Sequence, residues 1–157
     1  GENIKYLLKA FPNSKITGLD ISHEALEIIK EFEKSQNLFL KQCDLSNLKN
    51  IQNIKSKSFD NIIISHVLSA LLKDDISKTT IFRSDLIKEC LRISKKNLVI
   101  IDSEKMFYGD DKYFTIEQIN RGLCYHNILD LNSVYDSKRE KILIKHNRII
   151  ALNIYND

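Results

Sequence analysis

The chain has 157 residues, of which 43% are hydrophobic and 29% are charged, a balance typical of one soluble globular domain. Its 24 basic and 21 acidic residues are interspersed and leave a net charge of +3, which argues against a protein that binds nucleic acid through a clustered basic face. No apolar run approaches the roughly 20 residues that a membrane-spanning helix needs. The composition therefore excludes a membrane span and a disordered chain.

In the first half of the chain, apolar residues alternate between helical spacing and short strand-like runs. The pattern predicts, in order, a helix over residues 2–11, a strand over 15–19, a helix over 22–35 with Ser22 as its N-cap, and a strand over 37–43. Residues 45–57 are polar and irregular, with one helical turn.

The strongest strand signal is the unbroken β-branched run from Ile62 to Ile64, which suits a strand buried on both faces of a parallel sheet. The second half is predicted to contain, in order, a strand over residues 59–65, a short helix or loop over 67–72, a helix over 81–93, a strand over 98–101, a helix over 115–125, and a hairpin over 141–144 and 148–155.

This alternation of strands and helices predicts an α/β fold, with a single domain over residues 1–157. We expect a mainly parallel sheet that ends in a C-terminal antiparallel hairpin. Ligands of such sheets bind at the carboxyl ends of the strands. The residues that directly follow each strand are therefore the candidate site.

Cysteine, histidine and basic residues give little sign of a metal or polyanion site. Cys43, Cys90 and Cys124 lie far apart without a CxxC pair, which predicts buried thiols in a reducing compartment, here the cytoplasm. The four histidines lack ligand spacing, so no metal is expected. One basic run is interpreted as a solvated hairpin face, with contact to a nucleic acid or another polyanion as the alternative: Lys138, Arg139, Lys141, Lys145 and Arg148.

Two acids directly follow predicted strands. Asp20 can accept hydrogen bonds from both hydroxyls of a ribose, because a carboxylate has two acceptor oxygens, and Ile21 offers an apolar face for an adenine ring. Asp44 can accept from the exocyclic amine of adenine, with Leu45 packing on the ring. The alternative is that Asp20 only caps the next helix and Asp44 only forms a turn.

Three segments in this order carry a family resemblance: Ile16–Ser22, Gln42–Leu45 and Ser58–Leu68. The last contains Phe-Asp, a hydrophobic run, a polar residue and Val-Leu. Over roughly residues 1–103, the chain resembles the class I S-adenosylmethionine-dependent methyltransferases, which have a Rossmann-like three-layer sandwich fold. The resemblance implies that S-adenosyl-L-methionine is the cofactor and adds Gly1 and Ser65 to the cofactor-binding candidates.

The pattern departs from the family at its start, where a first strand and a glycine-rich loop would precede the helix at 2–11. Gly1 resembles the last glycine of that loop, whose glycines let the backbone approach the cofactor. We therefore expect an N-terminally truncated domain with weak or absent cofactor binding. The missing strand would lie between the strands at 15–19 and 59–65, which must then pair directly or leave open edges.

The resemblance implies transfer of a methyl group to a nucleophile by in-line displacement. No base is evident; the candidates are His66, Tyr108 and His126, each of which can equally pack locally. Asp102 and Ser103 follow the strand at 98–101 and can line the acceptor pocket or simply end the strand. An Asn/Asp-Pro-Pro-aromatic motif is absent, which disfavours amino methylation of nucleic acids. Small molecules, sugars and lipids remain as acceptors.

Two other functions are compatible with these residues. A nicotinamide-dependent oxidoreductase fragment shares the strand-end acid Asp20, but it explains Asp44 and the segment Phe59–Leu68 less well. A non-catalytic Rossmann-like binding module would account for the missing glycine loop. A preference for adenosylhomocysteine over nicotinamide nucleotides separates the methyltransferase from the oxidoreductase.

Overall fold

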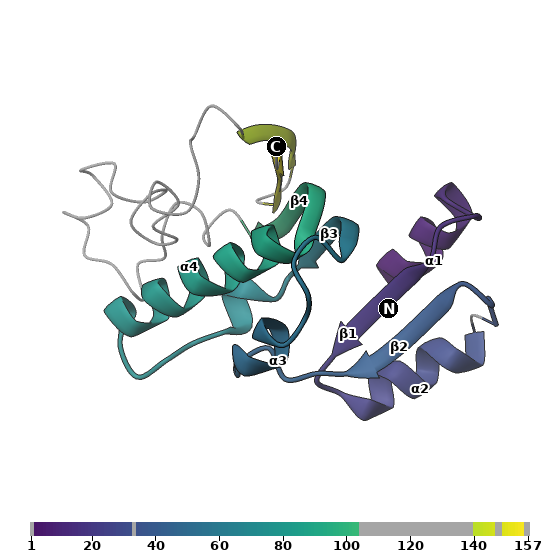
Figure 1. Cartoon of the computed structure of the whole chain (residues 1–157), viewed down its shortest axis with the longest axis horizontal. Helices are drawn as coiled ribbons and strands as arrows, with labels where there is room; N and C mark the ends of the chain where they lie inside the picture. The colour runs from purple at the N-terminus through teal and green to yellow at the C-terminus, as the bar shows by residue number, and fades with distance from the viewer. Residues whose placement is uncertain (1, 33, 104–139, 147–148, 156–157) are drawn as a thin grey trace. The chain divides into compact units, whose positions relative to one another are not determined.

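The computed structural model describes residues 2–32, 34–103, 140–146 and 149–155 (Figure 1). The chain divides into two compact units, Gly1–Asn50 and Ile51–Asp157, each with its own sheet. A single domain over residues 1–157 stays a prediction. Among the described residues, no helix has the length and apolar character needed to cross a membrane.

The first unit is a strand–helix–strand motif preceded by a helix. It contains α1 (Glu2–Ala10), β1 (Ile16–Asp20), α2 (His23–Phe32) and β2 (Leu38–Gln42). β1 and β2 are parallel and in register from Ile16 opposite Leu38 to Asp20 opposite Gln42. Parallel strands cannot be joined by a tight turn, and α2 provides the crossover that their pairing requires.

The start of α2 follows from its sequence. Ser22 Oγ accepts a hydrogen bond from the Ala25 N–H at 3.1 Å, which satisfies one of the amide groups left without a partner at a helix N-terminus. Leu26 and Ile29, three residues apart, are 3% and 8% exposed and turn one face of the helix toward the core. The predicted N-cap is therefore confirmed.

Gly18 in β1 is a close-packing position. A Cβ atom there would lie 2.8 Å from Leu40 Cδ2 and 2.9 Å from Ile4 Cδ1. Ile4 belongs to α1 and Leu40 is the partner of Gly18 in β2, so both press on the same face of the sheet. The absence of a side chain lets α1 lie close against the two strands.

The second unit holds a four-stranded sheet of order β3-β4-β6-β5. β3 and β4 are parallel, whereas β6 runs antiparallel to both β4 and β5. A short helix, α3 (Lys49–Gln52), spans the boundary between the units. The elements of the second unit are, in order, β3 (Phe59–Ser65), the 3-10 helix η1 (Leu68–Ala70), α4 (Ile76–Ile93), β4 (Ser94–Ser103), β5 (Glu140–His146) and β6 (Ile149–Tyr155).

The core of this unit lies between α4 and one face of β4. Leu98 and Ile100, two residues apart and so on the same face of the strand, are fully buried. Leu86 and Ile87 of α4 are also buried, and α4 packs against β4. Ile154 of β6, opposite Leu98, completes this apolar layer.

The predicted boundaries differ most from the structure at α4 and β4. α4 begins at Ile76 and not at residue 81, because Asp75 caps it by accepting the Lys78 N–H at 2.7 Å. Its first turn is polar and carries no apolar periodicity. β4 is longer than the predicted 98–101, because it pairs with a strand on each side. The helix predicted over residues 115–125 lies outside the described residues.

β1 and β3 each keep an open edge among the described residues, since β1 pairs only with β2 and β3 only with β4. In a parallel ladder, alternate residues bond to one neighbour, so the N–H and C=O groups of Thr17, Leu19, Asn61 and Ile63 point to these open edges. That these two strands pair directly or leave open edges stays a prediction.

Arg92, in the last turn of α4, holds the segment between α3 and β3. Its Nε donates to Glu89 Oε2 at 2.7 Å. The two terminal nitrogens of the guanidinium donate to three backbone carbonyls and one hydroxyl at 2.8–3.3 Å: Ile51 O, Gln52 O, Ile54 O and Ser56 Oγ. Only a planar fork with five N–H donors can serve this many acceptors from one side chain.

We expect Arg92→Met to lower the free energy of unfolding by about 2–3 kcal/mol, because the Ile51, Gln52 and Ile54 carbonyls each lose a donor, and two of these hydrogen bonds are part-buried. Lys88→Met is the matched control, since Lys88 lies on the same helix and, within the described ranges, makes an exposed ion pair with Asp85 at 3.6 Å. That change should cost less than about 0.5 kcal/mol. Urea unfolding followed by circular dichroism measures both values. Equal losses in the two variants would contradict this role for Arg92.

Candidate functional site

The carboxyl ends of β1 and β2 meet at one edge of their sheet. The Cys43 N–H donates to the Asp20 carbonyl at 2.8 Å, one residue beyond the regular ladder. The backbone therefore brings Asp20 and Ile21 next to Asp44 and Leu45, as expected for residues that follow neighbouring parallel strands.

Asp20 has two distinct carboxylate oxygens. Oδ1 accepts a hydrogen bond from the Ser22 N–H at 2.9 Å, which fixes the turn into α2. Oδ2 accepts no hydrogen bond from the part of the chain that the structure describes. The side chain is half-buried. Asp20 therefore shapes the turn with Oδ1 and leaves Oδ2 without a hydrogen bond among the described residues.

Ile21 directly follows β1, and its side chain is 62% exposed. Gln42 Nε2 donates to the Ile21 carbonyl at 2.9 Å and so ties the end of β2 to this turn. The backbone of residue 21 is thus fixed, while its apolar side chain stays accessible. An exposed isoleucine on a fixed backbone is a surface on which a flat ring can pack.

Asp44 begins a compact loop closed by hydrogen bonds of its own. Its Oδ1 accepts the Ser46 N–H at 2.8 Å, and its carbonyl accepts from Asn50 Nδ2 at 2.8 Å. The Asn50 N–H donates to the Asn47 carbonyl at 3.1 Å. The turn-forming role of Asp44 is therefore observed.

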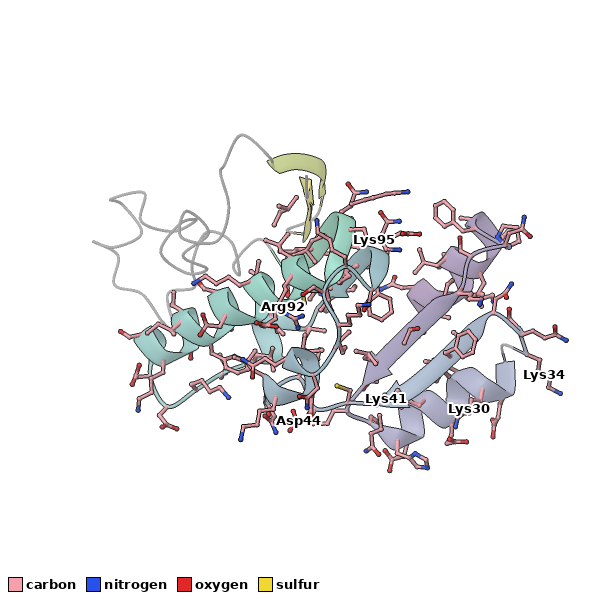
Figure 2. The ribbon with its side chains drawn as sticks, in the orientation of Figure 1. Lys30, Lys34, Lys41, Asp44, Arg92 and Lys95 are labelled. Carbon is pink, nitrogen blue, oxygen red and sulfur yellow. The ribbon has the colours of Figure 1, made fainter. Side chains whose placement is uncertain are left out.

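A pocket of about 260 Å³ opens at this edge of the sheet. Figure 2 shows Lys41 and Asp44 at the end of β2. The pocket is smaller than the roughly 300–1,000 Å³ typical of whole small-ligand sites, and it therefore suits part of a ligand. Its lining residues are Ile21, Lys41, Gln42, Cys43, Asp44 and Asn50.

The pocket holds one cation, one anion and one buried thiol. Burial raises the pKa of the Cys43 thiol, the Asp44 carboxylate raises it further, and Lys41 opposes the shift. Cys43 is 9% exposed and therefore stays a neutral thiol at physiological pH. The polar chemistry of the pocket comes from Lys41, Gln42, Asp44 and Asn50.

The structure places the other predicted site residues differently. Leu45 is half-buried and does not line the pocket. Ser65 is the last residue of β3 in the second unit, and His66 follows it and donates its N–H to the Ile101 carbonyl at 2.8 Å. His66 is exposed and has a positive φ of 54°, a conformation uncommon for residues other than glycine. Gly1, Tyr108 and His126 lie outside the described residues.

Asp102 is fully buried and serves the fold. Its Oδ2 accepts the Ser69 N–H at 3.2 Å and so holds the 3-10 helix η1 over the end of β4. Ser103 is the last residue of β4. Within the described ranges, no group of three or more His, Cys, Asp or Glu side chains is arranged to hold a metal ion.

The pocket includes polar residues that the sequence analysis did not identify: Lys41, Gln42 and Asn50. Gln42 could have been found, because it precedes the Cys-Asp pair at the end of a predicted strand. Asn50 has no comparable signal. It reaches the pocket only because the loop from Asp44 folds back on itself through hydrogen bonds.

The sequence matches the methyltransferase domain family over residues 1–89, which is more than half of the chain. The chain belongs to this family. The predicted kinship with class I S-adenosylmethionine-dependent methyltransferases is therefore confirmed. Among curated proteins, none matches this sequence.

Solved structures confirm the Rossmann-like α/β fold. An S-adenosylmethionine-dependent methyltransferase from Methanosarcina mazei is 17% identical with a TM-score of 0.56, and the match covers 96% of this chain and 84% of that chain. The PH0226 protein from Pyrococcus horikoshii is 14% identical with a TM-score of 0.57, covering 98% and 76%. CurJ carbon methyltransferase is 13% identical with a TM-score of 0.60, covering 98% and 45%. The chain spans only 39% of an S-adenosylmethionine-dependent methyltransferase from Mesorhizobium loti.

The two described cysteines should resist alkylation in the folded protein. Burial raises the pKa of Cys90 to about 12, so at pH 9 only about one thiol in a thousand is ionised. The thiolate is the reactive form, and a raised pKa moves the onset of labelling to higher pH. Peptide mapping after iodoacetamide treatment should show both sites labelled rapidly in urea and slowly without it. Labelling of Cys90 in the folded protein at the rate of an unfolded peptide would contradict the structure.

Proposed function

We propose that the chain carries the adenosine-binding half of the cofactor site of an S-adenosylmethionine-dependent methyltransferase, and that the protein transfers a methyl group to a small-molecule acceptor. One observation carries the proposal. At a single sheet edge, a carboxylate with an oxygen that is open among the described residues, an exposed apolar side chain and a pocket with hydrogen-bond acceptors lie together.

These residues fit the chemistry of an adenosine. Asp20 has the acceptor capacity for ribose hydroxyls, and Ser22 needs only one of its oxygens. Ile21 provides an apolar surface for the base. Asp44 supplies an acceptor for its amine inside a pocket of suitable size. Gly1, Leu45 and Ser65 stay candidates for cofactor binding on the family resemblance alone.

When bound, S-adenosylmethionine supplies a methyl group already activated on a sulfonium. The work left to the protein is to orient the cofactor, and good orientation can contribute up to about 7–11 kcal/mol to lowering a barrier. In this chain, the paired turns after β1 and β2 perform that task for the adenosine end. They are fixed by hydrogen bonds from Gln42, Ser22 and Asn50.

The acceptor is proposed to be a small molecule, a sugar or a lipid. The only proline of the sequence is Pro12, in the turn before β1, so the sequence has no Asn/Asp-Pro-Pro-aromatic motif. His66 is the described candidate for a base, because it is exposed and follows the carboxyl end of β3. Tyr108 and His126 remain candidates on the sequence alone.

The binding prediction is tested by titrating the isotope-labelled chain with adenosylhomocysteine and recording amide chemical shifts. We expect a Kd on the order of 1 mM, equivalent to about −4 kcal/mol, because only adenosine contacts are provided. The amides of Ile21, Asp44 and Asn50 should shift most. NAD at the same concentration should shift them less.

Asp20→Asn is the decisive variant, because asparagine keeps an acceptor for the Ser22 N–H and replaces the other oxygen by a donor. Losing one charge-assisted hydrogen bond should weaken binding about tenfold or more, so the shifts should vanish at the same ligand concentration. Asp74→Asn is the control, since the Asp74 side chain is 91% exposed and lies in the second unit. The proposal fails if no amide near the pocket responds in the unaltered chain, or if NAD is preferred.

A further inference from the structure

We infer that Asn50 determines base specificity in this pocket: its side-chain oxygen accepts the second hydrogen of an adenine amine, beside the hydrogen taken by Asp44. The inference rests on the proposed function, because it concerns the same site. The juxtaposition that carries it is Asn50 and Asp44, both in the pocket lining and joined by a hydrogen bond of 2.8 Å.

The hydrogen bond between Asn50 and Asp44 determines which branch of the Asn50 side-chain amide is the nitrogen and which is the oxygen. A backbone carbonyl can only accept, so the nitrogen must face the Asp44 carbonyl. The oxygen is then on the other branch of the same planar group. Oδ1 accepts no hydrogen bond from the described part of the chain. Asn50 thus brings an acceptor oxygen to the lining of the pocket, and its place on the amide is fixed.

A single acceptor would discriminate poorly between bases here. Lys41 also lines the pocket, and its ammonium is a donor that favours a carbonyl such as the one at position 6 of hypoxanthine. An exocyclic amine has two in-plane hydrogens, whereas a carbonyl in the same place has two lone pairs. Two acceptors, Asp44 and Asn50, satisfy both hydrogens of the amine and oppose both lone pairs of the carbonyl.

Adenosine and inosine are the probes, because they differ at this position of the base and share the ribose. Their Kd values are measured by amide-shift titration of the chain. The unaltered chain should prefer adenosine by at least about tenfold, because bound inosine covers the two acceptors without supplying hydrogens for them. In Asn50→Ala, adenosine should bind about fivefold more weakly and inosine should change less than twofold.

Two further variants distinguish base recognition by Asn50 from a purely structural role in holding the loop that begins at Asp44. Asn50→Asp keeps an acceptor oxygen but cannot donate to the Asp44 carbonyl, so the preference for adenosine should persist. Asn47→Ala changes the same loop outside the pocket lining, where Asn47 Oδ1 accepts the Lys49 N–H at 3.2 Å. It should affect both nucleosides equally.

The outcomes are distinct. A preference that falls about fivefold in Asn50→Ala and is kept in Asn50→Asp supports the inference. An equal loss for both nucleosides in Asn50→Ala overturns it and leaves only the loop-holding role. An unaltered chain that binds adenosine without preference also overturns it, while leaving the proposed function intact. An unaltered chain that binds neither nucleoside overturns the proposed function as well.

Discussion

Backbone hydrogen bonds between β1 and β2 are the constraint on which the candidate site depends. Because the strands run parallel, their carboxyl ends lie at the same edge of the sheet. The residues that directly follow each strand therefore lie at that edge as well. Side chains then fix the two turns that follow these strands. Asp20 and Ser22 fix the first turn, and the second turn is fixed from Asp44 to Asn50. Neither turn could form a pocket wall without the strand pairing beneath it.

In the second unit, side-chain contacts as well as backbone hydrogen bonds connect the helices and strands. Its parallel strands are joined through α4, whose buried face meets Leu98 and Ile100. Two buried or part-buried polar side chains complete the connections, because Arg92 collects the carbonyls before β3 and Asp102 holds η1 after it. Each polar group forms hydrogen bonds to backbone atoms, which is the usual condition for keeping such groups inside a protein.

Much of this fold could be predicted from local pattern. The run Ile62–Ile64 and the cap at Ser22 are strong signals, because each depends on residues close in sequence. The positions of Asp20 and Asp44 near strand ends were predictable for the same reason, since a polar residue after an apolar run marks the end of a strand. The family could be recognised because three such segments occur in order, and the match over residues 1–89 agrees with it.

Other features could not be predicted, since they depend on contacts between distant parts of the chain. Asn50 enters the pocket through a bond to a residue six positions earlier, and Gln42 reaches a carbonyl 21 positions away. Arg92 meets carbonyls about 40 residues distant. A short local stretch of sequence contains no pattern that predicts partners this far away. The early start of α4 was missed for a simpler reason, because a capped polar turn lacks periodicity.

The loop from Asp44 to Asn50 has its shape before any ligand arrives. Its Asp44 carboxylate, Asp44 carbonyl and Asn47 carbonyl are already engaged within the loop, and Gln42 has already joined it to the turn at Ile21. A ligand that enters such a preorganised wall orders few new rotamers and loses little conformational entropy to the protein. Affinity at this edge then depends on how well the ligand complements the pocket, so small chemical differences between ligands change the affinity.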